Sequence, residues 1–179
     1  MRETATKRSS RFTFGKNEIR WELGLALIAI SPVTVSDIDF IEDVAKRCGL
    51  SYWARADYLN ELDRDDSIFF KATRRDDRCL GFIVGRLVPG LVREDKFDAE
   101  IYNIGVLPNI QNSGIGSCLM GAFLTDCRDR SVGAVWLEVR RSNSTAIAFY
   151  SKHGFDLMTV RRTFYRDPVE DAIVMKSTL

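Results

Sequence analysis

The sequence predicts an α/β fold with a mixed central sheet and helices on both faces. Apolar segments of strand length alternate with amphipathic segments of helix length, in the order βααβββαβαββ. No internal repeat, low-complexity block or proline-rich linker interrupts this order. The 179 residues, 45% hydrophobic and 28% charged, are enough for one domain with a substantial core.

The first half of the chain predicts a strand, two helices and three more strands. LALIAISPV (25–33) has the composition of the first strand. Ser36 and Asp37 can cap a helix that ends near Arg47, and residues 54–62 predict a second, shorter helix. The next three strands are expected at 67–72, 80–88 and 100–106.

The second half predicts alternating helix and strand. Apolar residues that recur at intervals of three and four predict a helix from Gly114 to about Arg130. VWLEV (135–139) predicts a short buried strand. A helix then begins at Asn143 or Ser144 and ends at His153, with Gly154 as its C′ residue. Two final strands, joined by a polar connection, are expected at 155–160 and 172–176.

Composition and charge exclude several classes of function. The net charge of +1, without a basic patch carrying interleaved aromatics, argues against direct nucleic-acid binding. The longest apolar run near the N-terminus, 23–30, is too short to cross a membrane. With one histidine (His153) and no CxxC pair, we expect no metal site and four reduced cysteines. We interpret residues 1–24 as a flexible extension and residues 25–179 as the domain.

The loop QNSGIG (111–116) precedes a predicted helix, and this placement favours anion binding. The first N–H groups of a helix have no partner inside the helix, and the helix dipole adds partial positive charge there. Gly114 and Gly116 allow close backbone approach and positive φ. The loop has neither the lysine of a phosphate loop nor the third glycine of a dinucleotide fingerprint. A loop that merely needs two flexible residues explains the pattern equally well.

Glu138 and Tyr150 are the candidate catalytic residues. A glutamate is unusual within a short apolar strand, so Glu138 is either used chemically or lies on an edge strand, in water or paired with Arg140. Asn143 and Tyr150 are two helical turns apart and share one side of a helix. Taken separately, Asn143 is explained as a helix N-cap and Tyr150 as a core aromatic.

Together these residues resemble the GNAT family of acyl-CoA-dependent N-acetyltransferases. QNSGIG is similar to the family's Arg/Gln-x-x-Gly-x-Gly/Ala motif. LEVRRSNSTAIAFYSKHGF (137–155) and VRRTFYRDPVEDAIVM (160–175) resemble the RimI-like branch, the ribosomal-protein alanine N-acetyltransferases. The resemblance is strong over residues 101–176, weak before residue 80, and implies the GNAT fold.

The resemblance also implies residue roles. Glu138 matches the general base and Tyr150 the general acid. Acetyl-CoA is the implied co-substrate, and its pantetheine arm would pair with the strand that ends in Ile104, Gly105 and Val106. The residues that match the diphosphate loop or another cofactor contact are Gln111, Asn112, Ser113, Gly114, Ile115, Gly116, Ser117 and Asn143. Many relatives carry an arginine at Gln111 or Asn112, so here the diphosphate would rest on backbone N–H groups, with help from Arg140 or Arg141.

The implied acceptor is a protein or peptide N-terminus, such as that of a ribosomal protein. Tyr165, Glu170 and Asp171 could bind that N-terminus or could serve only as turn residues. A small-molecule amine acetyltransferase, acting on a polyamine or an antibiotic-like amine, and a non-catalytic acyl-CoA-binding module are the alternatives. We expect a cytoplasmic enzyme that works as a monomer or weak dimer without a metal.

Overall fold

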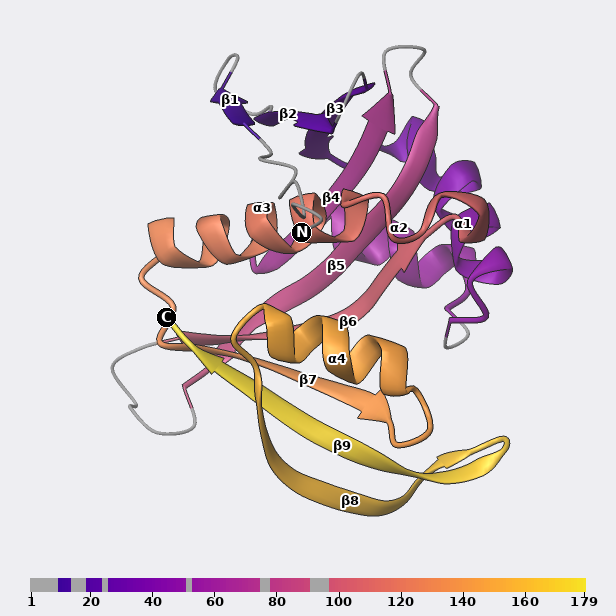
Figure 1. Cartoon of the computed structure of the whole chain (residues 1–179), viewed down its shortest axis with the longest axis vertical. Helices are drawn as coiled ribbons and strands as arrows, with labels where there is room; N and C mark the ends of the chain where they lie inside the picture. The colour runs from indigo at the N-terminus through magenta and orange to yellow at the C-terminus, as the bar shows by residue number, and fades with distance from the viewer. Residues whose placement is uncertain (1–9, 14–18, 24–25, 51–52, 75–77, 91–96) are drawn as a thin grey trace, which may run out of the picture. The chain divides into compact units, whose positions relative to one another are not determined.

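The computed structural model describes residues 10–13, 19–23, 26–50, 53–74, 78–90 and 97–179 (Figure 1). The chain forms two compact units. Unit 1 comprises Met1–Arg64, Phe69–Ile83 and Ile104–Ala122, and unit 2 comprises Asp65–Ile68, Val84–Asn103 and Phe123–Leu179. Strands β4, β5 and β6 and helix α3 each contribute residues to both units.

The predicted order of elements is confirmed from β3 onward. The strands are β1 (Ser10–Thr13), β2 (Ile19–Leu23), β3 (Ala26–Pro32), β4 (Ser67–Arg74), β5 (Cys79–Pro89), β6 (Phe97–Val106), β7 (Ala134–Arg140), β8 (Asp156–Arg166) and β9 (Val169–Thr178). The helices are α1 (Ile38–Arg47), α2 (Arg55–Leu62), α3 (Ile115–Asp129) and α4 (Ser144–Lys152), with 3₁₀ turns at Val35–Asp37 and Pro108–Ile110. Antiparallel pairs and one parallel pair occur together, as a mixed sheet requires.

In unit 1, β1, β2, β3 and β4 pair antiparallel in sequence order. Ile30 of β3 lies opposite Ile19 of β2 on one side and Ala72 of β4 on the other. The sequence predicted no strand before residue 25, so β1 and β2 are additions. They fall within the predicted extension 1–24, the rest of which lies outside the described residues, and the division at residue 24 stays a prediction.

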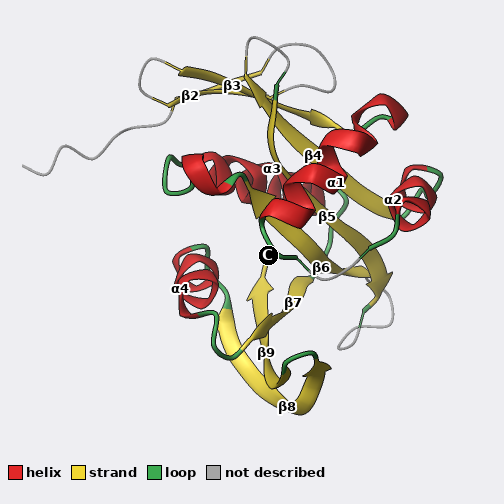
Figure 2. Cartoon of the chain, turned by 90° about the vertical axis from the view of Figure 1, so that its right-hand side faces the viewer, coloured by secondary structure: helices red, strands yellow, loops and turns green. Residues whose placement is uncertain are grey.

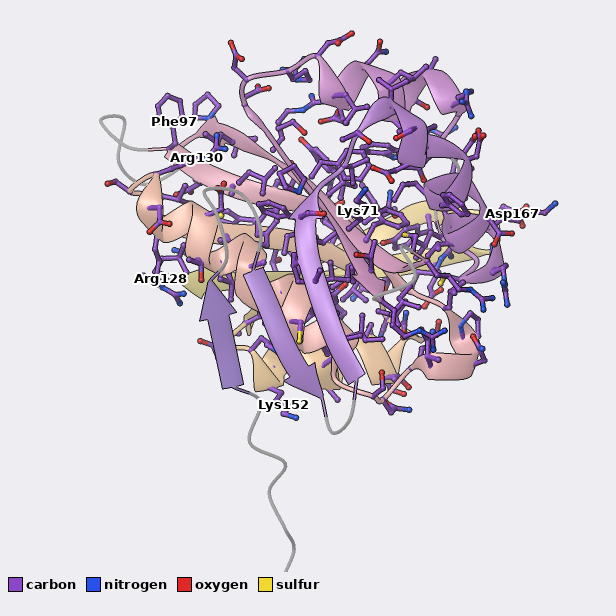
Figure 3. All side chains as sticks on the ribbon, turned by 90° about the horizontal axis from the view of Figure 1, so that it is seen from above. Lys71, Phe97, Arg128, Arg130, Lys152 and Asp167 are labelled. Carbon is purple, nitrogen blue, oxygen red and sulfur yellow. The ribbon has the colours of Figure 1, made fainter. Side chains whose placement is uncertain are left out.

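Helices α1 and α2 lie on one side of β4 and β5 in unit 1, and the first turns of α3 lie on the other (Figure 2). Helix α1 buries one apolar face, since Ile38, Ile41 and Val44 are at most 2% exposed. The same unit contains an ion pair between Lys71 of β4, labelled in Figure 3, and Asp37, with Nζ 2.5 Å from Oδ2. This pair joins the start of α1 to the sheet.

An aromatic cluster anchors α2 in unit 1. The ring of Tyr58 lies 5.2 Å from that of Trp53, 6.2 Å from that of Phe69 and 6.1 Å from that of Phe82, between centroids. Tyr58 is 1% exposed, yet its hydroxyl has no hydrogen-bond partner among the described residues. A buried polar group without a partner lowers the stability of the folded protein. The ring of Tyr58 therefore stabilises the fold through packing, whereas its hydroxyl destabilises it.

Tyr58→Phe should therefore stabilise the protein. Removing the unpaired hydroxyl should raise the free energy of unfolding by about 1 kcal/mol, and the melting temperature by roughly 2–4 °C for a chain of this size. Urea and thermal unfolding of the full chain measure both quantities. A clear loss of stability would mean that the hydroxyl has a bonding partner after all.

In unit 2, β6 and β7 are parallel, β7 and β9 are antiparallel, and β9 and β8 form a long hairpin beside which α4 lies (Figure 1). The register between β6 and β7 ends at the pair Ile101–Leu137, although both strands continue beyond it. Glu138 therefore lies on the part of β7 that pairs with β9 alone.

The hairpin corrects the predicted ends of the last two strands. The expected strands 155–160 and 172–176, with a polar connection between them, are too short, because β8 runs to Arg166 and β9 begins at Val169. Most of β8 is exposed, since it lies at the end of the strand order. A strand exposed on both faces has no apolar alternation, so its polar half looked like a loop in the sequence.

All four cysteines are free in the structure, and three of them are buried. In the described part of the chain, no helix has both the length and the apolarity needed to span a membrane.

Candidate active site

The loop before α3 belongs to unit 1, and its backbone is arranged for close approach. Gly114 has a φ of 95° and Asn112 a φ of 61°, so the positive φ predicted for the first glycine is confirmed. The Gly114 carbonyl accepts from the Cys118 N–H at 3.1 Å, and this is the first hydrogen bond of helix α3. The N–H groups of Ile115, Gly116 and Ser117 therefore have no partner within α3, as expected for an anion site.

Two loop side chains bond back to the protein. Gln111 Nε2 donates to the Val106 carbonyl at 3.0 Å, and Ser113 Oγ donates to the Ile110 carbonyl at 2.6 Å. Gln111 thus anchors the loop to the end of β6, and the backbone N–H groups are left for a ligand. This arrangement fits a diphosphate held by main-chain amides rather than by an arginine side chain.

The end of β6 is closely packed against α1 in unit 1. A Cβ on Gly105 would lie 3.0 Å from Leu50 Cδ1, whose side chain would have to shift slightly, and 3.5 Å from Val44 Cγ1 of α1. The Val106 carbonyl accepts from Cys48 Sγ at 3.1 Å as well as from Gln111. Because two donors already bond this carbonyl, the groups left for an added ligand strand are other backbone atoms of the Ile104–Val106 segment.

Glu138 belongs to unit 2 and lies one residue beyond the end of the register between β7 and β6. Strand β7 lies between β6 and β9 in the strand order, so it is not an edge strand, although at Glu138 itself it pairs with β9 alone. Its side chain is 19% exposed and forms an ion pair with Arg161 of β8. The predicted alternative partner, Arg140, instead bonds to Glu170. Glu138 is thus a half-buried carboxylate with one cationic neighbour.

Tyr150 also belongs to unit 2, where α4 buries it to 8% exposure. Its ring lies 5.9 Å from that of Phe155 and 5.5 Å from that of Phe149, between centroids. Burial raises the pKa of Tyr150, and the neighbouring Tyr165 raises it further. The phenol is therefore protonated at neutral pH, as a proton donor must be.

Tyr165 lies within electrostatic reach of both candidate catalytic residues. Burial raises its pKa, and the charge of Glu138 raises it further. Arg140 stacks over its ring, with Cζ 4.1 Å from the centroid. Tyr165 therefore couples electrostatically to Glu138 and to Tyr150 within unit 2, although sequence reasoning had left it between a substrate contact and a turn residue.

Sequence reasoning missed Glu100. It lies on β6 between buried Ala99 and Ile101, and its register partner on β7 is Trp136. Burial raises the pKa of Glu100, and the charge of Glu138 raises it further. A charged residue between buried strand neighbours was the signal that identified Glu138, and the same signal would have identified Glu100.

Asn143 is the N-cap of α4, as its position before the helix predicted. Its Oδ1 accepts from the Ala146 N–H at 3.0 Å. Asn143 is exposed and belongs to unit 2, whereas the loop 111–117 belongs to unit 1. Its role as a cofactor contact stays a prediction.

Asn143→Ala should therefore lower the free energy of unfolding by about 1 kcal/mol, because the N-cap bond is lost. Asn143→Asp should leave stability nearly unchanged, since aspartate accepts the same bond. Denaturant unfolding measures both variants. If Asn143→Ala leaves stability intact, the cap does not contribute to the fold.

The two arginines proposed to help the diphosphate have other partners. Arg140 bonds to the hairpin between β8 and β9, and Arg141 Nη1 lies 3.6 Å from Asp171 Oδ2. Asp171 Oδ1 also accepts from the Thr163 N–H at 3.0 Å. Glu170 and Asp171 lie in β9 and bond to neighbouring segments of unit 2, so they are strand residues and the turn interpretation is wrong for them. Among the described residues, no three His, Cys, Asp or Glu side chains are grouped as metal ligands.

Comparison with known proteins matches residues 38–155 to the acetyltransferase (GNAT) family. The ribosomal protein bS18-alanine N-acetyltransferase of Salmonella typhimurium is 31% identical over 149 residues, which cover 82% of this chain and 94% of that protein. The N-alpha-acetyltransferase RimI of Mycobacterium tuberculosis is 32% identical over 155 residues, covering 81% and 92%.

Comparison with solved structures supports the same family. The ribosomal-protein-S18-alanine N-acetyltransferase from Escherichia coli has a TM-score of 0.73 at 29% identity, covering 84% of this chain and 93% of that one. Ard1 from Thermoplasma volcanium has a TM-score of 0.74 at 28% identity, covering 85% and 97%. The chain therefore belongs to the GNAT acetyltransferase family, as an acetyl-CoA-dependent N-acetyltransferase of the RimI-like kind.

Proposed function

We propose that the enzyme acetylates the N-terminal α-amine of a protein, most simply a ribosomal protein. The observation that supports this proposal is the electrostatic coupling of Tyr165 to both Glu138 and Tyr150 within unit 2. Two relatives of the chain are named as a ribosomal protein bS18-alanine N-acetyltransferase and an N-alpha-acetyltransferase.

Glu138 acts as the general base, because the acceptor amine must be neutral before it attacks the thioester. A peptide α-amine has a pKa near 8, so its deprotonation at pH 7 costs about 1.4 kcal/mol, whereas a lysine amine near 10.4 costs about 4.6 kcal/mol. One half-buried carboxylate, acting directly or through a water, can readily deprotonate the α-amine. The chemistry therefore favours an N-terminal amine over a lysine side chain.

Tyr150 acts on the leaving sulfur. A thiol has a pKa of about 8.5, well below that of a buried phenol, so complete proton transfer to the thiolate is uphill. Tyr150 therefore contributes chiefly a hydrogen bond that strengthens as charge develops on sulfur, with proton donation late in bond cleavage. The N–H groups of Ile115–Ser117 would hold the diphosphate, while Ile104–Val106 would align the pantetheine arm.

A three-acceptor assay tests the proposal. Thiol release from acetyl-CoA is measured with an alanine-starting peptide, an N-terminally blocked lysine peptide and spermidine. Release with the first peptide alone, together with a mass increase of one acetyl group on its N-terminus, is the expected result. Release only with spermidine would make the enzyme a small-molecule acetyltransferase. Tight coenzyme binding without any release would make it an acyl-CoA-binding module.

A further inference from the structure

Arg140 is the last residue of β7, and its side chain bonds to the tip of the β8–β9 hairpin, a contact distinct from the diphosphate role that the resemblance implied. Its Nη2 donates to the Asp167 carbonyl at 2.8 Å, and its Nη1 donates to the Pro168 carbonyl at 3.2 Å. Asp167, labelled in Figure 3, and Pro168 form the turn of the hairpin. One guanidinium therefore holds both carbonyl groups of this turn.

Glu170, on strand β9 of the hairpin, also bonds to Arg140. Its Oε2 accepts from Arg140 Nη1 at 3.3 Å, and its Oε1 accepts from the Ser142 N–H. The hydrogen bond from the Ser142 backbone lowers the pKa of Glu170, so the carboxylate is ionised at neutral pH. Because Ser142 lies in the connection from β7 to α4, the carboxylate joins that connection to the hairpin.

The stacked ring of Tyr165 makes this contact relevant to the reaction. Tyr165 lies opposite Glu170 in the hairpin register, and Arg140 covers its face at 4.1 Å. Tyr165 is also the residue that couples electrostatically to Glu138 and to Tyr150. A shift of the hairpin tip would therefore move Tyr165 relative to both candidate catalytic residues.

We propose that Arg140 is a positioning residue, which fixes the hairpin tip and the ring of Tyr165 so that the acceptor amine meets Glu138 and Tyr150 in a productive geometry. This inference rests on the proposed function. A lysine cannot replace the arginine, because it has one rotatable ammonium in place of a planar fork that bonds several acceptors and stacks on an aromatic face.

The test compares Arg140→Gln and Arg140→Lys with Arg128→Gln in the full chain. Arg128 of α3 is the matched control, because it carries the same charge, is exposed, and donates from Nη1 to the Leu124 carbonyl of its own helix at 3.5 Å. We expect kcat/KM for the acceptor to fall at least tenfold in both Arg140 variants, with acetyl-CoA affinity by calorimetry within twofold of wild type. Arg128→Gln should stay within twofold in both measurements.

A second readout does not depend on activity. The five tyrosines are labelled with 3-fluorotyrosine, and Tyr165→Phe identifies the fluorine resonance of Tyr165. We expect this resonance to shift or broaden in both Arg140 variants and to stay in place in Arg128→Gln. If Arg140→Gln does not fold, Glu170→Gln, which keeps Arg140 and removes the bridging carboxylate, should show the same change with a smaller loss of kcat/KM.

Two results would overturn the inference: a Tyr165 resonance that does not respond to Arg140, or an Arg140→Lys enzyme with wild-type kcat/KM. If the wild-type enzyme ignores the alanine-starting peptide, the proposed function fails. The positioning role is then decided by the Tyr165 resonance and by kcat/KM for whichever acceptor of the three-acceptor assay is active.

Discussion

Tyr150→Phe should lower kcat by about 100-fold or more, while acetyl-CoA binds with nearly wild-type affinity. The expected size is that of removing one positioned proton donor from the reacting group. Phenylalanine fills the same buried space next to Phe155, so the fold should be preserved. Because the hydroxyl acts on charge that appears only as the C–S bond breaks, its loss should affect kcat and kcat/KM equally.

Steady-state kinetics with the peptide acceptor and calorimetry with acetyl-CoA measure the two quantities. Tyr58→Phe is the matched control, because it removes the hydroxyl of another buried tyrosine outside the candidate site. Its kcat should equal that of the wild-type enzyme. Unchanged turnover in Tyr150→Phe would remove Tyr150 from the mechanism.

Glu138→Gln should depress the rate most strongly at low pH. Near pH 6 only about 1% of an α-amine with a pKa near 8 is neutral, so turnover depends on a base, and the expected loss is about 100-fold or more. Near pH 9 most of the amine is already neutral, and the loss should shrink. The measurement is kcat/KM for the peptide from pH 6 to pH 9.

Glu100→Gln distinguishes between the two neighbouring carboxylates. Both lie on the unit 2 sheet and influence each other electrostatically, but only Glu138 pairs with Arg161. The pH dependence of Glu100→Gln should follow that of the wild-type enzyme. A loss in Glu138→Gln that is uniform across pH would assign Glu138 to positioning instead of proton transfer.

The candidate site was predictable where it depends on local sequence. Glycine at position 114 predicted a positive φ before a helix, and the apolar spacing that follows predicted α3. The apolar residues on either side of Glu138 predicted a strand within the sheet, and Asn143 predicted the start of α4. The family motifs also predicted the type of reaction, because each motif is a short segment of continuous sequence.

The sequence by itself thus determined the order of elements from β3 onward, the conformation of the loop and the candidate catalytic pair. Only the tertiary structure decided the partners of those residues. Arg161 lies 23 positions from Glu138 and Glu170 lies 30 positions from Arg140, and either pair could be lost through a small change in the hairpin. Local patterns arise from neighbouring residues, whereas these pairs depend on the register and length of β8 and β9, which no local pattern specifies.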